Sequence, residues 1–275
     1  MTLAASVLAT GFFASDVRAI AADEIVDVEL VLAVDVSLSM SPAELVIQRD
    51  GYAAALTDPT VLGAIADGMH GKIAVTYVEW AGQFSQTVVV PWTVIASPED
   101  AAGFVRQMTA TPPRSARRTS ISSALEFSAK LFADSGFQGF KRVIDVSGDG
   151  PNNQGQQVDL VRDQVLRDGI TINGLPLMTN GNGMITPFDI NNLDSYYTDC
   201  VIGGPGAFMI PVNQWSQFPE AIRRKLVLEL ARADHPLHAV MEAAHPPVIR
   251  AAATEKADCL IGEKIWNSRP WMDLQ

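Results

Sequence analysis

The apolar run LVLAV at residues 30–34 is the feature that most restricts how this chain folds. A continuous apolar run, in place of an alternating one, is typical of a strand whose two faces are both covered by helices. We therefore expect residues 29–36 to form a buried strand of a mostly parallel sheet. With 275 residues, 48% of them hydrophobic, the chain can bury the core of one large domain.

Strand and helix patterns alternate after this run. Residues 81–83 connect two strand patterns too closely for a parallel pair and so predict a hairpin. The sequence thus predicts an α/β fold: a doubly wound, mostly parallel six-stranded sheet with one antiparallel edge strand and helices on both faces. The predicted strands are residues 29–36, 73–80, 84–90, 140–147, 170–177 and 207–212, and the predicted helices are residues 42–56, 98–108, 120–134, 157–168, 190–200 and 215–231.

Both ends of the chain lie outside this alternation. Residues 1–22 carry an apolar run followed by small residues, which is typical of a secretory signal peptide. The usual basic start is missing, so an ordinary N-terminus is the alternative. The alternating domain is residues 24–232, and residues 233–275 form a C-terminal extension with several prolines. Because no later stretch reaches the ~20 apolar residues of a membrane span, we expect no membrane span and a periplasmic or secreted protein.

The chain contains two cysteines, Cys200 and Cys259. In an oxidising compartment such a pair can close one disulfide, whereas in the cytosol two unrelated buried thiols are expected. The cysteines are far apart in sequence and have no histidine beside them, so we do not expect a zinc site.

The formal net charge of −11 excludes some classes of partner. Nucleic-acid binding depends on Lys and Arg that neutralise phosphates, and anionic lipid requires the same charges, so neither partner is expected. An acidic surface suits a cation or a basic protein, but it also serves simply to keep a protein soluble.

Polar side chains follow three of the predicted strands. Asp35, Ser37 and Ser39 alternate where the first strand ends, so their side chains can point to one spot. Thr119 opens a predicted helix, and Asp149 follows the strand that ends at residue 147. Because ligands of open parallel sheets bind beyond the carboxyl ends of the strands, these five residues are the candidate site.

Carboxylate and hydroxyl oxygens without thiolate or imidazole favour a hard cation, which we expect to be Mg²⁺, with Mn²⁺ or Ca²⁺ as alternatives. Two carboxylates only just balance a divalent charge, so the cation would still attract an Asp or Glu of a protein partner. A simpler interpretation is also open. Ser37 and Ser39 would then cap the following helix, and Asp35 would accept backbone N–H groups in a turn.

These residues resemble the metal-ion-dependent adhesion site of von Willebrand factor type A domains, which are related to integrin I domains. The resemblance rests on Asp35-x-Ser37-x-Ser39, on Thr119 in an Arg-Thr-Ser turn, and on Asp149 followed by glycine. It implies that the three hydroxyls bind the metal and that the two carboxylates bind it directly or through water. The segments VIDVSGDGPNN and YYTDCVIGGPGAF resemble a bacterial secreted branch of that superfamily.

Two positions depart from the pattern of the family. Gly148 stands where a threonine or a similar residue is expected, and Arg117-Arg118 replaces the usual glycine before Thr119. Neither change removes a predicted ligand. The resemblance implies a divalent-cation-dependent, protein-binding module for adhesion or assembly, and not an enzyme.

Two alternatives to this module remain. In a phosphatase of the haloacid dehalogenase type, an acid stands two residues after the nucleophilic aspartate. Ser37 occupies that place and cannot protonate a leaving group. No G-x-S-x-G elbow and no phosphate-binding glycine loop occurs either. A metal-dependent phosphohydrolase therefore ranks behind the binding module, beside a structural envelope protein without a functional metal.

Overall fold

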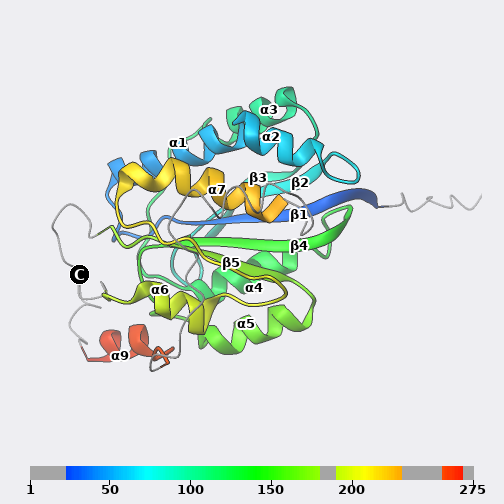
Figure 1. The fold of residues 1–275 in the computed structure, drawn as a ribbon. Helices are drawn as coiled ribbons and strands as arrows, with labels where there is room; N and C mark the ends of the chain where they lie inside the picture. Colours follow the sequence, from blue (N-terminus) through cyan, green and yellow to red (C-terminus); the bar gives the residue numbers. More distant parts are fainter. Residues whose placement is uncertain (1–22, 180–189, 231–255, 269–275) are drawn as a thin grey trace, which may run out of the picture.

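Figure 1 shows the computed structural model of the chain, which describes residues 23–179, 190–230 and 256–268. A twisted sheet with the strand order β3-β2-β1-β4-β5 forms the middle layer, and helices cover both of its faces. β3 runs antiparallel at one edge, and the other neighbouring strands are parallel. The strands are β1 (Glu24–Asp35), β2 (Ile73–Trp80), β3 (Gln86–Ile95), β4 (Phe137–Gly148) and β5 (Thr171–Pro176).

β1 lies at the centre of the sheet because its apolar run is buried on both faces. Residues 28–35 are all buried, and β1 pairs with both β2 and β4. The predicted α/β fold is thereby confirmed, including the hairpin that makes β3 an antiparallel edge strand.

The predicted number of six strands is wrong, because the sheet has five. Residues 207–212 do lie beside β5, but only through the isolated parallel bridges Gly174–Met209 and Leu177–Val212. Val212 donates a hydrogen bond to the Pro176 carbonyl, whereas Pro176 has no N–H to donate in return. The proline therefore interrupts the ladder that a sixth strand needs.

Two helical layers enclose the sheet (Figure 1). One face packs against α1 (Pro42–Leu56), α2 (Pro59–Ala66), α3 (Pro98–Met108) and α7 (Phe218–Leu230). The other packs against α4 (Ile121–Leu131), α5 (Val158–Arg167), α6 (Leu193–Tyr196) and the π-helix Tyr197–Val201 that continues it. The 3₁₀ turn Trp215–Gln217 precedes α7.

Among the described residues, two helices were not predicted, α2 and α9 (Ile261–Asn267). α9 lies in the predicted C-terminal extension and sits against the face that carries α6 (Figure 1). Cys200 and Cys259 form a disulfide, as predicted for an oxidising compartment. Within the described ranges, no helix combines the length and the apolar character needed to cross a bilayer. The predicted signal peptide lies outside the described residues.

Candidate metal centre

Three loops meet at the carboxyl ends of the central strands. In the parallel register Val34 lies beside Ser147, so β1 and β4 end at the same edge of the sheet. Asp35 pairs with Trp80, the last residue of β2. The chain after β1 also runs beside the loop before α4, because Leu38 N–H donates to the Ala116 carbonyl and Ala116 N–H donates to the Val36 carbonyl.

Four of the five predicted site residues form one hydrogen-bonded group. The Ser39 hydroxyl donates to Asp149 Oδ1 at 2.8 Å, and the Ser37 and Ser39 hydroxyl oxygens are 2.8 Å apart. The Ser37 N–H donates to Asp35 Oδ1 at 2.7 Å. Asp35 and Ser37 are buried, Asp149 is half-buried and Ser39 is exposed, so the group opens to solvent at Ser39.

The helix-cap interpretation of the two serines is wrong. α1 is capped by Ser41, whose hydroxyl accepts a hydrogen bond from the Glu44 N–H at 3.3 Å, while the Glu44 carboxylate accepts one from the Ser41 N–H at 2.7 Å. This reciprocal pair is a complete capping box. Ser37 and Ser39 are therefore not needed at the start of the helix.

Thr119, the fifth predicted residue, lies in the adjoining loop and is almost fully buried. Both of its backbone groups pair with Asn153: the Thr119 N–H donates to Asn153 Oδ1 at 3.0 Å, and the Asn153 N–H donates to the Thr119 carbonyl at 2.8 Å. The loop after β4 thus carries Asp149 and also holds the backbone of Thr119.

The two departures from the family pattern have physical explanations. A Cβ atom at Gly148 would lie 3.0 Å from Asp35 Oδ2, 3.0 Å from the Tyr197 hydroxyl and 3.3 Å from the Trp80 ring. The π-helix and the end of β2 therefore fill the space that a threonine at position 148 would need.

Arg118 has a backbone conformation that favours glycine. Its φ of 76° lies in the left-handed region, which glycine adopts freely and which strains other residues. The Arg118 guanidinium lies over the Trp266 ring at 3.2 Å from the ring centroid. This contact provides attraction that offsets part of the backbone strain.

The donor atoms fit a hard divalent cation. Asp35 Oδ2 is buried and has no hydrogen-bond partner, although its carboxylate would be ionised at neutral pH if exposed. Burial, and then the charge of Asp149, raise the pKa of Asp35 well above its usual range. A cation beside the two carboxylates would offset both effects, since it supplies a charged partner for the buried carboxylate and cancels the repulsion.

The structure describes no group of three or more His, Cys, Asp or Glu side chains that could hold a metal ion within residues 23–179, 190–230 and 256–268. The candidate site therefore depends on hydroxyls for its remaining ligands. Ser37, Ser39 and Thr119 are the residues that would supply them.

Asp145, which sequence reasoning left out of the site, belongs to a separate buried network. It is fully buried in β4 and pairs with Lys225 of α7 at 2.9 Å. Lys225 also contacts Glu229 at 2.5 Å, and Glu229 accepts a hydrogen bond from the Asn173 side chain at 3.0 Å. This network ties α7 to the sheet, so Asp145 has a structural role.

Sequence reasoning missed the role of Asn152 and Asn153. Both are buried, and each side-chain oxygen accepts from a backbone N–H of another segment: Asn152 from Ser122 in the first turn of α4 at 3.0 Å and Asn153 from Thr119 in the loop before α4 at 3.0 Å. Two adjacent asparagines after Asp149 in GDGPNN were the visible signal. Their partners lie 30 and 34 residues away along the chain, so the sequence did not reveal them.

A family model matches residues 25–234, and its description is "Protein of unknown function (DUF1194)". The chain belongs to the DUF1194 family. No curated protein matches the chain.

Solved structures place this DUF1194 domain among von Willebrand factor type A folds. The mussel byssus protein proximal thread matrix protein 1, with a zinc-occupied adhesion-site motif, is 15% identical with a TM-score of 0.53 over 76% of this chain and 48% of its own. The Lactobacillus rhamnosus GG pilus adhesin SpaC is 11% identical with a TM-score of 0.53, over 75% of this chain and 31% of its own. A von Willebrand factor type A protein of Catenulispora acidiphila is 14% identical with a TM-score of 0.50 over 74% and 42%.

The DUF1194 chain therefore spans half or less of the length of these solved neighbours. At such low identity the likeness establishes the fold alone. The resemblance to type A domains is confirmed at this level, and the ligand set remains a prediction that rests on the residues of this chain.

Proposed function

We propose that this DUF1194 protein is a divalent-cation-dependent, protein-binding module for adhesion or assembly. Asp35, Ser37, Ser39, Thr119 and Asp149 would hold the cation, which we expect to be Mg²⁺, with Mn²⁺ or Ca²⁺ as alternatives. The observation that carries the proposal is the buried, unpartnered Oδ2 of Asp35, which lies in a group of oxygen ligands. A buried carboxylate oxygen without a partner is costly unless a ligand completes it.

The site residues would bind the cation and leave one side of it accessible to a partner. A bound cation would supply positive charge that attracts a carboxylate. The Ser37 N–H keeps Asp35 oriented through Oδ1, which leaves Oδ2 free for the cation. Exposed Ser39 and half-buried Asp149 place the open side at the surface, where a partner can reach it.

The partner that fits is a protein with an exposed Asp or Glu. Two carboxylates balance a divalent cation and leave no excess negative charge at the site to repel a third. The titles of two solved neighbours name a pilus adhesin and a thread matrix protein, which supports a role in adhesion or assembly. The same titles support a non-enzymatic role. The Cys200–Cys259 disulfide supports a periplasmic or extracellular location.

Calorimetric titration with Mg²⁺ and Mn²⁺ tests the site. We expect wild type to bind one cation, Asp35→Ala to bind none, and Asp134→Asn, which changes an exposed carboxylate outside the site, to bind like wild type. The absence of binding by wild type would refute the metal site.

A capture experiment tests the partner. Immobilised protein is exposed to an envelope extract of the source cell with Mg²⁺ or with a chelator, and we expect partner proteins to be retained only with Mg²⁺. Equal retention in both conditions would reduce the cation to a structural role. Phosphatase turnover that disappears in Asp35→Asn would instead favour the enzyme alternative.

A further inference from the structure

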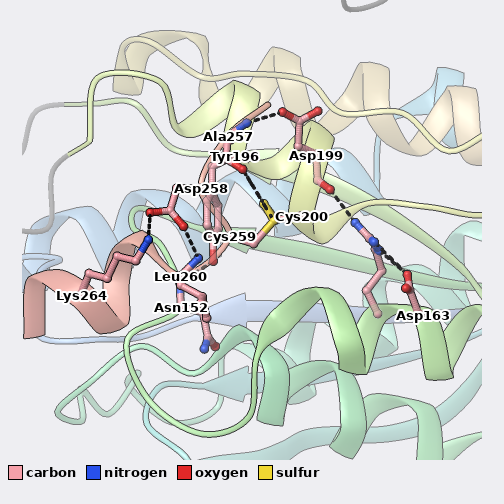
Figure 2. The surroundings of a disulfide bond; sticks show 11 residues. Asn152, Asp163, Tyr196, Asp199, Cys200, Ala257, Asp258, Cys259, Leu260 and Lys264 are labelled. Carbon is pink, nitrogen blue, oxygen red and sulfur yellow. Dashed lines mark hydrogen bonds and ion pairs between the residues drawn. A yellow bond between two sulfur atoms is a disulfide. The ribbon is translucent and has the colours of Figure 1, made fainter. Parts of the chain in front are cut away.

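The C-terminal segment, residues 256–268, contains none of the five residues that would hold the cation. It is joined to the π-helix after α6 by the Cys200–Cys259 disulfide, and the Ala257 N–H donates to Asp199 Oδ2 at 2.7 Å (Figure 2). α9 follows directly after Cys259 and is half-buried along much of its length. These two anchors place α9 beside the loops of the candidate metal centre.

α9 contacts the loop after β4 at Asn152. The Asn152 side-chain NH₂ donates to Glu263 Oε1 at 2.7 Å, while its Oδ1 accepts from the Ser122 N–H in the first turn of α4. Gly262 packs directly on this loop, since a Cβ atom there would lie 2.0 Å from the Asn152 carbonyl oxygen. The position of α9 therefore affects the side chain that holds the start of α4.

α9 also contacts the turn before Thr119. Trp266 lies against the Arg118 guanidinium, and Arg118 has the left-handed backbone conformation that favours glycine. A ring that attracts the arginine side chain stabilises this conformation against relaxation of the turn. Because Thr119 is the next residue, its position depends on the same turn.

We propose that the C-terminal segment positions the candidate metal centre, with Glu263 and Trp266 as positioning residues that act through Asn152 and Arg118. The segment keeps the Arg118–Thr119 turn and the Asn152–Asn153 loop in register with each other. The part of this proposal that concerns the cation rests on the proposed function. The part that concerns the two loops applies to the metal-free protein and is tested there.

The disulfide is what makes such a small element effective. α9 has seven residues, and an isolated helix of that length does not persist in water. The disulfide holds Cys259 at the π-helix, so Glu263, about one helical turn further on, is kept near Asn152. Docking of α9 then costs little chain entropy.

The main alternative is that the segment only covers apolar surface. Ala257, Cys259 and Ile261 do pack against the apolar cluster beneath α4 and α5. A segment with this role alone would change the global stability of the domain when it is displaced. Displacing it would not accelerate hydrogen exchange of the Thr119 and Ser122 amides more than that of the amides of the sheet.

Amide hydrogen exchange in the metal-free protein separates the two roles. Gly262→Ala forces α9 away from Asn152, and Gly63→Ala is the matched control, because a Cβ atom at Gly63 meets nothing within 4 Å. We expect exchange of the Thr119 and Ser122 amides to accelerate about tenfold or more in Gly262→Ala, with the β1 amides unchanged, and no change in Gly63→Ala.

Equal exchange of the Thr119 and Ser122 amides in wild type and Gly262→Ala would overturn the proposal. Acceleration of the β1 amides by the same factor would also overturn it, because the effect would then be global. Trp266→Ala provides a second variant that introduces no steric clash. It should accelerate the Thr119 amide more than the Ser122 amide, since Trp266 lies against the Arg118 guanidinium, next to Thr119 in the chain.

Mn²⁺ titration connects this result to the metal centre. We expect Gly262→Ala and Trp266→Ala to bind Mn²⁺ about fivefold or more weakly than wild type, a coupling of ordinary size. Faster exchange with unchanged Mn²⁺ affinity would overturn the claim that the segment acts on the metal centre. If wild type does not bind Mn²⁺, the proposed function fails, while the exchange rates still decide whether the segment positions the two loops.

Discussion

Asp35→Asn should stabilise the metal-free protein while abolishing its response to Mg²⁺. The substitution keeps the size of the side chain and the Oδ1 that accepts from the Ser37 N–H. It removes a buried charge whose Oδ2 has no partner and which is repelled by Asp149. Leaving a buried group unsatisfied costs about 1–3 kcal/mol, and more when the group is charged, so replacing the charge by a neutral amide should raise the free energy of unfolding in chelator by an amount of this order.

Urea unfolding in chelator and in Mg²⁺ measures both effects. With an m-value of about 2 kcal/mol/M, the midpoint in chelator should rise by roughly 0.5–1.5 M in Asp35→Asn. At a Mg²⁺ concentration one hundred times its Kd, the free energy of unfolding of wild type should rise by about 2.7 kcal/mol, while that of the variant should not change. In Mg²⁺ the variant should therefore lose most or all of its stability advantage over wild type. Asp134→Asn, an exposed change, should stay within about 0.5 kcal/mol of wild type in both conditions.

Two results would refute this reasoning. If Asp35→Asn is less stable than wild type in chelator, the Asp35 carboxylate is already satisfied in the metal-free protein. If wild type gains no stability from saturating Mg²⁺, the cation does not bind the folded state in preference to the unfolded one.

Three further predictions concern the surroundings of the site. Lys225→Met should lower the free energy of unfolding by about 3–5 kcal/mol at pH 8 in chemical denaturation, because Asp145 and Glu229 lose their buried counter-charge. Burial raises the pKa of Asp145 to about 7, so this loss should be smaller at pH 5, where the carboxyl is neutral. An equal loss at both pH values would contradict the network. The double variant Cys200→Ser/Cys259→Ser removes a cross-link between residues with a sequence separation of 59, so the free energy of unfolding should fall by about 4 kcal/mol. Calorimetry should show a Tm lower by roughly 8–16 °C. An unchanged Tm would mean that the disulfide adds no constraint. Gly148→Ala places a Cβ atom 3.0 Å from Asp35 Oδ2, so it should lower the free energy of unfolding by about 1–3 kcal/mol and weaken Mg²⁺ binding in titration. A variant with the stability and Mg²⁺ affinity of wild type would show that the Tyr197 ring moves aside freely.

Local signals explain which parts of the fold were predictable. The apolar run at residues 30–34 predicted a strand over residues 29–36, which lies largely within β1, and the helix predicted over residues 42–56 has the bounds of α1. The missing sixth strand has a local cause as well, because Pro176 cannot donate the hydrogen bond that the ladder needs. That proline was visible in the sequence, and its effect on the strand count was overlooked.

Long-range contacts explain what could not be predicted. The need for glycine at position 148 comes from Tyr197 and Trp80, which lie far from it in sequence. The sequence allowed the Cys200–Cys259 disulfide, but only the fold shows that this disulfide places α9 against the candidate site. Lys225 pairs with Asp145 across a helix–sheet interface, and neither residue has a neighbour in sequence that identifies the other.

Two unfavourable features of this domain lie at or beside the candidate site. Asp35 is a buried carboxylate with an unpartnered oxygen, and Arg118 has a backbone conformation that glycine adopts more easily. Such features persist only where the surrounding structure holds them, and they are typical of binding sites. Here the support comes from Asn152 and Asn153 within the domain and from α9 outside the alternating strands and helices. A substitution that relieves either feature should therefore make the metal-free protein more stable and the cation site weaker, which no substitution at an ordinary structural position would do together.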